Sequence, residues 1–337
     1  MIEVCYKVGK PRIGRGKLYI VDTQGVRGME EKLTLARGTH VIVRNRHEVQ
    51  WGLDATQSGI LPVGRALAAH VAAVFLTLRR TPLTLPEVVA RLEKCGIDAW
   101  LARVMIDDLR SYRIIIPVPR PNRRVLLLGR SMTANVMADI LRHAGVLVER
   151  TEAGFPDDYM LKTMAKPTTD PVIVVDRAAH FELLAPWLHA KAQTVVPVNL
   201  VDSTGVIGPL RLDGEGPCVL CSMLHQVETD PRWVHVVRQT PLGAPTPQPA
   251  FAYAVAARAA WWVQTLLDAP FPPGAPVQRL HPGFVETFSP LTGEVSAATM
   301  QTHRRCYVCF HLNDSAGRIS AGTAQEIPAT AGQTPAT

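Results

Sequence analysis

The sequence has no long hydrophobic run and no recognisable export signal. Its longest apolar run, residues 66–78, contains His70 and is shorter than the roughly 20 residues that a membrane-spanning helix needs. The first residues, MIEVCYKVGKPRIGRGK, are mixed and charged, with no apolar segment behind them. We therefore expect a cytoplasmic protein with no membrane partner, in which residues 66–78 belong to a buried helix.

Charged residues are also scarce, at 19%, whereas hydrophobic residues make up 47% of the 337 positions. Most of the chain should therefore fold, and its length suits two or three domains. The net charge of +7 favours an acidic partner. The basic residues are dispersed, apart from short clusters such as residues 120–124, so we interpret them as a solvated surface and do not expect a nucleic acid partner.

Only six cysteines are present, and four of them form two Cys-x-x-Cys pairs. The first pair is Cys218 and Cys221 in GPCVLC, and the second is Cys306 and Cys309 in RRCYVCF. Thiols stay reduced in the cytoplasm, and zinc prefers four soft ligands in a tetrahedron. The two pairs therefore predict a structural zinc with a closed ligand shell. We expect a metal site rather than a redox-active pair, because neither pair is predicted to begin a helix after a strand.

The first half of the chain contains strand signals followed by three helices. Residues 39–53 predict a strand pair, and residues 59–63 predict a third strand. The first predicted helix covers residues 65–78. The second begins at Thr84, with Glu87 completing a capping box, and ends before Gly96.

The third predicted helix begins at Asp98 and leads into a strand at residues 113–118. Its apolar spacing predicts one buried face, made of Leu101, Val104, Met105 and Leu109. Three helices followed by a strand, with tight turns, are typical of a winged helix.

The second half follows a Pro-rich linker at residues 117–122 and alternates strands with helices. The predicted strands are 125–128, 146–149, 171–175 and 194–198, and the predicted helices are 132–144, 181–190 and 251–268. This spacing predicts an α/β domain with a parallel, doubly wound, Rossmann-like sheet. The expected division is an N-terminal extension (1–38), a winged-helix-like domain (39–118), a Rossmann-like domain with the zinc site (119–312) and a disordered tail (313–337).

A nucleotide-binding fingerprint would fall between residues 124 and 141, but it is damaged there. The G-x-G-x-x-G positions read Gly129, Ser131 and Ala134, so the glycine that would admit a phosphate is a serine. Glu149 stands at the ribose-binding position, and Asp176 follows a strand where a metal–phosphate carboxylate could stand. We predict a degraded site that does not bind ATP. A strand-terminal Glu149 and a surface Asp176 without any ligand remain open alternatives.

The chain resembles a known family in three segments: RNRHEVQWGLDATQSGIL (44–61), TGVIGPLRLDGEGPCVLCSMLHQVETDPRW (204–233) and the closing CYVC. It is similar to the ThiF/MoeB-like, ubiquitin-activating-enzyme-like adenylating proteins. Within that superfamily it is most similar to the bacteriocin biosynthesis cyclodehydratase C proteins. These are the leader-peptide-binding partners of YcaO enzymes in thiazole/oxazole-modified peptide biosynthesis. The resemblance covers about residues 40 to 310.

The resemblance implies that the winged helix is a RiPP recognition element, which binds the leader of a precursor peptide by adding a strand to its small sheet. The expected contacts are the edge-strand residues Gly59, Ile60, Leu61 and Val63 and the third-helix residues Arg103, Asp107 and Arg110. The resemblance also implies a zinc, a degraded ATP site and a possible homodimer. The ATP-dependent chemistry would then belong to a separate YcaO-type cyclodehydratase.

The sequence thus predicts a non-catalytic scaffold that presents a precursor peptide to a cyclodehydratase. One alternative is a ThiF-like adenylating enzyme that uses Glu149 and Asp176 with MgATP. A second alternative is a winged-helix DNA-binding regulator. The acidic residues on the predicted third helix fit a phosphate-lined groove poorly.

Overall fold

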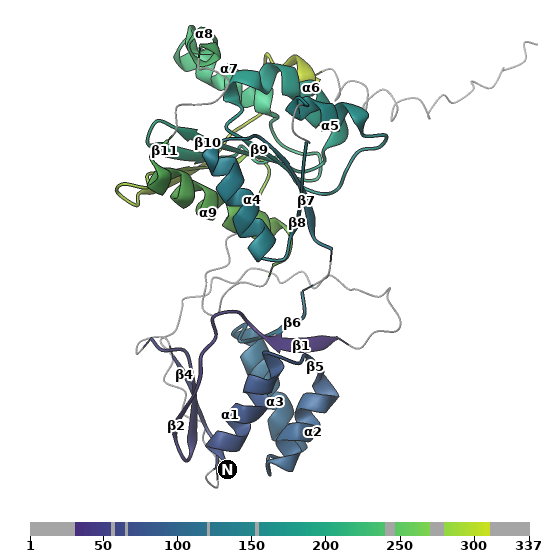
Figure 1. Cartoon of the computed structure of the whole chain (residues 1–337), viewed down its shortest axis with the longest axis vertical. Coiled ribbons are helices and arrows are strands. Elements are labelled where there is room, and N and C mark those ends of the chain that lie inside the picture. Colours follow the sequence, from purple (N-terminus) through teal and green to yellow (C-terminus); the bar gives the residue numbers. More distant parts are fainter. Residues whose placement is uncertain are drawn as a thin grey trace, which may run out of the picture. The chain divides into compact units, whose positions relative to one another are not determined.

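The computed structural model describes residues 31–54, 58–64, 67–119, 122–151, 155–239, 247–269 and 280–310. These residues fall into two compact units, the first with the described residues up to 119 and residues 268–269, the second with those of 122–267 and 280–310 (Figure 1). Each unit has its own hydrophobic core, and the second has one core on each side of its sheet. Within the described ranges, no helix combines the length and apolar character that a bilayer span requires.

The first unit begins with two small antiparallel sheets. One contains β2 (Val41–Asn45), β3 (Glu48–Trp51) and β4 (Gly59–Pro62), in that order, which confirms the predicted strand pair and third strand. This sheet packs against α1 (Ala68–Leu78). The Trp51 ring meets the Phe75 ring edge-on, with 5.6 Å between the ring centroids. Both side chains are buried, so this contact joins sheet and helix in the core.

Helices α2 (Leu85–Lys94) and α3 (Ala99–Ser111) follow, and their starts are fixed by the caps that the sequence predicts. Thr84 Oγ1 accepts the Glu87 amide at 3.4 Å, and Glu87 Oε2 accepts the Thr84 amide at 2.7 Å. Asp98 Oδ1 accepts the Trp100 amide at 2.9 Å. The helix boundaries are therefore encoded locally.

The prediction of the buried face of α3 is partly wrong. Leu101 and Val104 are 42% and 37% exposed. The buried residues of the helix are Ala102, Met105, Ile106 and Leu109. Apolar spacing alone cannot tell which side of a helix meets the core when apolar residues occupy two faces.

The second small sheet of this unit contains β1 (Lys32–Leu35), β5 (Leu83–Thr84) and β6 (Ile115–Pro117), in the order β5-β1-β6. The sequence predicted only β6 of these. Strand β1 lies within the residues set apart as an N-terminal extension, yet it pairs antiparallel with β6, Leu35 opposite Ile115. Residues 32–35 therefore belong to the fold of the first unit.

The second unit is built on a sheet of seven strands (Figure 1). Its first half contains β7 (Arg124–Leu128), β8 (Leu147–Arg150), β9 (Val172–Val175) and β10 (Val195–Val201). These strands are parallel and lie in the order β8-β7-β9-β10, connected by α4 (Met132–His143), α5 (Asp157–Thr163) and α6 (Phe181–Lys191). The predicted Rossmann-like pattern is confirmed in this half.

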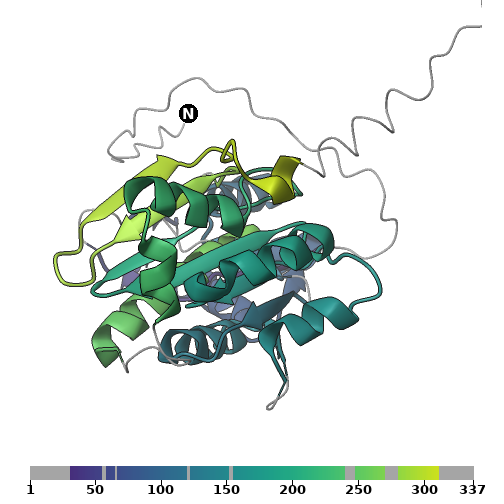
Figure 2. The ribbon, with the colours of Figure 1, turned by 90° about the horizontal axis from the view of Figure 1, so that it is seen from above.

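The expectation of a wholly parallel sheet is wrong for the other half. Strands β11 (Thr204–Ile207), β12 (Phe284–Phe288) and β13 (Val295–Thr299) continue the sheet from β10 in antiparallel pairs. In Figure 2 the yellow strands β12 and β13 lie at one edge of this sheet. The connection from β10 to β11 is too short for a parallel crossover, so the chain forms a hairpin.

Helices cover both faces of this sheet, as the doubly wound prediction requires. Helix α4 and helix α9 (Pro249–Leu266) share one core with the sheet. Helix α6 and helix α7 (Val219–Thr229) share the core on the other face, and α8 (Trp233–Arg238) follows α7. The cysteine pairs belong to this second core, on the face away from α9.

Candidate functional site

The four predicted ligand cysteines come together in the second unit. Cys218 is the N-cap of α7 and Cys221 lies in its first turn, but residues 208–217 separate β11 from this helix, so the pair does not directly follow a strand. Cys306 and Cys309 come from the segment after β13. All four side chains are buried, and their sulfur atoms all lie within 4.8 Å of one another.

The sulfur spacing fits a tetrahedral metal centre. The Sγ atoms of Cys218 and Cys306 are 3.5 Å apart, those of Cys221 and Cys309 are 3.6 Å apart, and those of Cys218 and Cys221 are 3.9 Å apart. Zinc–sulfur bonds of about 2.3 Å in a tetrahedron place sulfur atoms about 3.8 Å apart. A disulfide would need about 2.05 Å, and these cysteines are free. The four residues can therefore hold a zinc ion.

The pKa values of the four thiols are shifted in different directions. Hydrogen bonding, first of all from Cys218, lowers the pKa of Cys306 to about 7 and also lowers the pKa of Cys309. The pKa of Cys218 is raised, first through its hydrogen bond with Cys221 and also through burial. Metals bind cysteine as the thiolate, so metal binding at this cluster would displace the remaining thiol protons.

A second group of metal-ligating residues, His225, Glu228 and His303, lies beside the second cysteine pair. The amide of Arg305 donates to His303 Nδ1 at 3.1 Å, so the ring proton is on Nε2, 3.0 Å from Glu228 Oε1. A protonated Nε2 has no lone pair for a metal. The neighbouring His303 ring lowers the pKa of the Glu228 carboxyl, and this contact joins α7 to the segment that precedes Cys306.

Two of the damaged fingerprint residues, Ser131 and Asp176, are hydrogen-bonded to each other, and Gly129 lies against Val175. Ser131 is the N-cap of α4 and accepts the Ala134 amide at 3.2 Å. Gly129 has φ +124°, and a Cβ there would lie 2.3 Å from the Val175 carbonyl oxygen. The glycine is thus required by the turn itself, whatever the loop binds.

The remaining fingerprint residue, Glu149, lies 25 positions from its partner Arg124, with 3.1 Å between carboxylate and guanidinium. Arg124 also pairs with Asp170 at 2.7 Å. The next residue, Arg150, donates to the Gly129 carbonyl at 2.5 Å and to Asn135 Oδ1 at 2.8 Å. The groups that could bind ribose and phosphate are therefore paired with neighbouring side chains.

The predicted peptide edge lies in the first unit, at β4. Among the described residues, β4 pairs only with β3. The Val63 amide donates to the His47 carbonyl at 2.6 Å, and in an antiparallel pair such contacts alternate. The backbone amide and carbonyl groups of Leu61 and Gly59 therefore point toward β3, whereas those of Ile60 point away from it. Val63 itself is buried and lies one residue beyond the strand.

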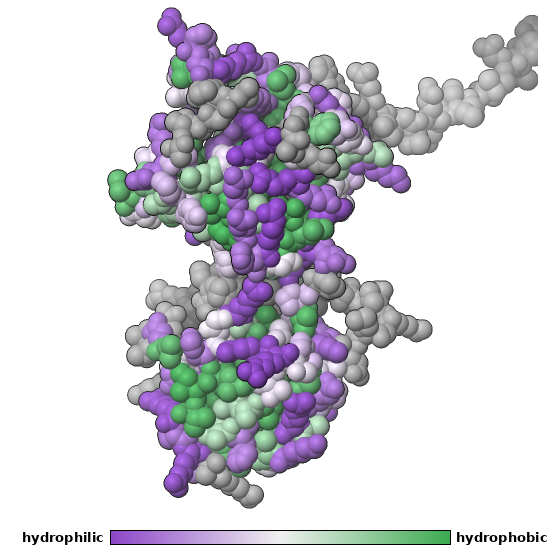
Figure 3. Space-filling view, viewed as in Figure 1, coloured by the Kyte–Doolittle hydropathy of each residue, from purple (hydrophilic) through white to green (hydrophobic). Residues whose placement is uncertain are grey.

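The predicted contacts on α3 are exposed to different degrees. Arg103 and Asp107 are exposed, and Arg110 pairs with Glu31 at 2.9 Å. Sequence reasoning missed the apolar side of this helix, where Trp100 is 71% exposed beside Leu101 and Val104. In Figure 3 apolar side chains also gather on the first unit over α1 and the small sheet.

No protein-family model matches the chain, and no curated protein matches it. Among solved structures, it is similar to the heterocyclase TruD, with 16% identity over 83% of this chain and 43% of TruD and a TM-score of 0.52. It is also similar to a heterocyclase solved with substrate and cofactor, with 17% identity over 83% of this chain and 39% of that chain and a TM-score of 0.51. E. coli MccB with ATP is a further similar structure, at 15% identity over 82% of this chain and 99% of MccB, with a TM-score of 0.47. The chain shares the fold of the two heterocyclases and spans less than half of their length.

Proposed function

We propose that the protein is a leader-peptide-binding scaffold in the biosynthesis of thiazole/oxazole-modified ribosomal peptides, and that it presents a precursor peptide to a YcaO-type cyclodehydratase. The observation that carries this proposal is the outward-facing edge of β4, in a small winged-helix-like unit. The fold that the chain shares with two heterocyclases supports the same pathway.

The β4 edge favours strand addition at a defined place. Ile60 offers an outward amide and carbonyl, whereas Pro62 offers only a carbonyl because proline has no amide hydrogen. An incoming leader strand would exchange two hydrogen bonds with Ile60. Backbone bonds of this kind accept many sequences, and neighbouring side chains supply the choice among leaders.

The exposed side chains of α3 are suited to selecting among leader sequences. Trp100, Leu101 and Val104 offer an apolar surface, and Arg103 and Asp107 offer charges of both signs. Aromatic and arginine side chains contribute most to binding at protein interfaces. We propose that apolar leader residues contact this face and that Arg103, Asp107 and Arg110 fix the position of polar ones.

The second unit supports a role without nucleotide chemistry. A phosphate would have to displace the Ser131 cap, and the carboxylate of Asp176 is already bonded to Ser131 and to the Leu200 amide. This arrangement disfavours the adenylating alternative. Holding the peptide raises the local concentration of its reactive segment at the partner's site, which accelerates the reaction without chemistry in the scaffold. The proposed zinc at the cysteine centre would stabilise the second unit.

The test is binding of fluorescein-labelled leader peptides from candidate thiazole/oxazole precursors, measured by fluorescence polarisation. The variant Ile60→Pro removes the outward amide of β4, and we expect at least about a tenfold loss of affinity. Val43→Pro is the matched control, because Val43 faces outward on the opposite edge of the same sheet. Equal affinity of the Ile60→Pro protein and the wild type would reject strand addition at β4.

A further inference from the structure

Arg211 is a buried cation without a carboxylate partner among the described residues. Its side chain is 6% exposed, and its segment is held to β10 by two backbone hydrogen bonds with Val195, at 2.9 and 3.1 Å. The guanidinium donates to the carbonyl oxygens of His189 at 3.1 Å and Gly214 at 3.1 Å. These acceptors satisfy its hydrogen bonds but leave its positive charge unbalanced, which is costly inside a protein.

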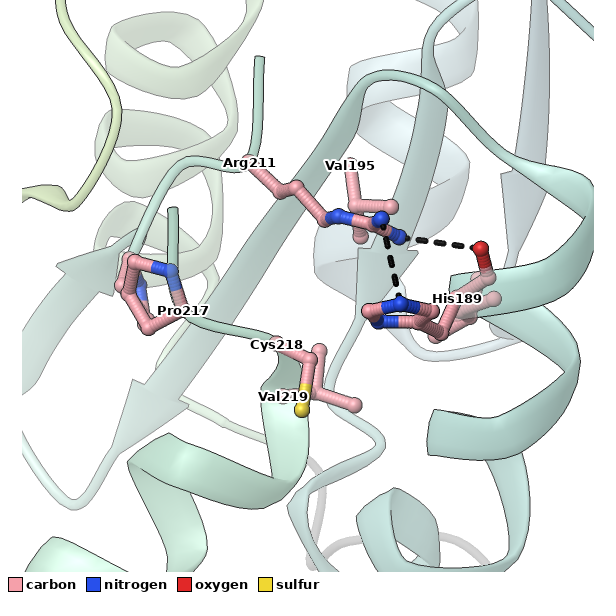
Figure 4. Close-up of a pocket in the computed structure, with 8 residues that line it drawn as sticks. His189, Val195, Arg211, Pro217, Cys218 and Val219 are labelled. Carbon is pink, nitrogen blue, oxygen red and sulfur yellow. Dashed lines mark hydrogen bonds between the residues drawn. The ribbon is translucent and has the colours of Figure 1, made fainter. Parts of the chain in front are cut away.

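The groups that can balance this charge are the cysteines. Arg211 and Cys218 line the same small pocket, together with His189 (Figure 4). Burial lowers the pKa of Arg211, and negative charge on Cys309 and Cys218 would counter that effect. His189 lies beside the guanidinium in this pocket, with its Nε2 3.5 Å from Arg211 Nη2.

We propose that Arg211 is the counter-charge of the cysteine centre, a positioning residue that stabilises the metal-bound tetrathiolate. This inference rests on the proposed metal. Four thiolates around Zn²⁺ carry a net charge of about −2, and the buried guanidinium offsets part of it. A buried guanidinium without a carboxylate partner therefore favours a negatively charged cysteine centre beside it, such as a metal-bound tetrathiolate.

The first test measures zinc affinity of the full chain by competition with a chromophoric chelator. We expect Arg211→Met to weaken zinc binding by about 10- to 100-fold, as changes next to ligand residues do. Arg211→Lys keeps the charge and should keep most of the affinity. The control is Arg258→Met, which removes another partly buried arginine that pairs with Glu286 in the core on the opposite face of the sheet. It should lower stability without changing zinc affinity.

The second test compares melting temperatures of metal-loaded and metal-free protein. If Arg211 balances the centre, Arg211→Met destabilises the loaded form but leaves the metal-free form equal to or more stable than wild type. Equal destabilisation of both forms would mean that Arg211 only connects neighbouring loops through its hydrogen bonds, and would overturn the inference. Unchanged zinc affinity in a folded Arg211→Met protein would overturn it too. Wild-type protein that binds no zinc would instead overturn the metal centre itself.

Discussion

Ser131 Oγ donates a 2.5 Å hydrogen bond to Asp176 Oδ2, joining the start of α4 to the end of β9. The other carboxylate oxygen, Asp176 Oδ1, accepts the Leu200 amide of β10 at 2.8 Å. Two residues that the sequence places in a nucleotide site therefore connect neighbouring elements at the carboxyl ends of the strands. Asp176 has φ +52°, a conformation that aspartate and asparagine adopt more readily than most residues.

Replacing Asp176 with asparagine tests whether this carboxylate serves stability or nucleotide binding. Asn keeps the shape and tolerates the backbone conformation, but it weakens two charge-assisted hydrogen bonds. We expect the free energy of unfolding to fall by about 1–3 kcal/mol, measured by urea denaturation. Isothermal titration with MgATP should show no binding to wild type or variant. Micromolar binding to the wild type with pyrophosphate release would restore the adenylating alternative.

Gly129 should be needed for folding, whatever the loop binds. Its positive φ and the 2.3 Å approach of an added Cβ to the Val175 carbonyl predict a large loss of stability in Gly129→Ala, about 3 kcal/mol or more. Gly145, at the end of α4, is the matched control. It also has positive φ (+80°) but no atom near an added Cβ, so Gly145→Ala should cost about 1 kcal/mol. Equal costs would show that conformation alone governs both sites.

The cysteine centre predicts that Cys218→Ser or Cys306→Ser releases zinc and destabilises the second unit. Loss of a structural metal removes binding free energy that also serves folding. Metal content by elemental analysis and thermal unfolding provide the measurement. Cys95→Ser is the control, because Cys95 caps α2 in the first unit and lies outside the cluster. Freshly purified wild-type protein without any bound metal would contradict the prediction.

The linker at residues 117–122 motivates a fragment experiment. Residues 1–118 contain the two small sheets and the three helices that the structure describes in the first unit. We expect this fragment to bind the labelled leader with an affinity close to that of the full chain, because the proposed contacts all lie within it. Circular dichroism checks that the fragment is folded, and a folded fragment that fails to bind would contradict the proposed division of labour.

Local patterns in the sequence predicted much of this structure. The Thr84–Glu87 capping box and the alternation of strands with helices after residue 124 depend on neighbouring residues, and the structure confirms both. The spacing of the two cysteine pairs likewise predicted a cluster, and the four thiols do meet.

The missed features depend on contacts between distant residues. Strand β1 has four residues and exists through its pairing with β6, more than 80 positions later. The antiparallel half of the second sheet depends on β12, which follows α9. The role of Arg211 requires its approach to α6 and the cysteines, and no local motif marks it. The apolar spacing of α3 did not predict its buried face correctly, because apolar residues occupy two faces of the helix.

The ligand pairs of the cysteine centre are separated by 88 positions, Cys218 to Cys306, with α9 and β12 between them. During translation the first pair therefore leaves the ribosome long before the second. A metal ion held by all four thiols could not be enclosed until Cys309 has emerged, after the seven described strands of the larger sheet have been made. Metal capture would thus follow the synthesis of β13, as a check that the nascent domain has been made at least that far.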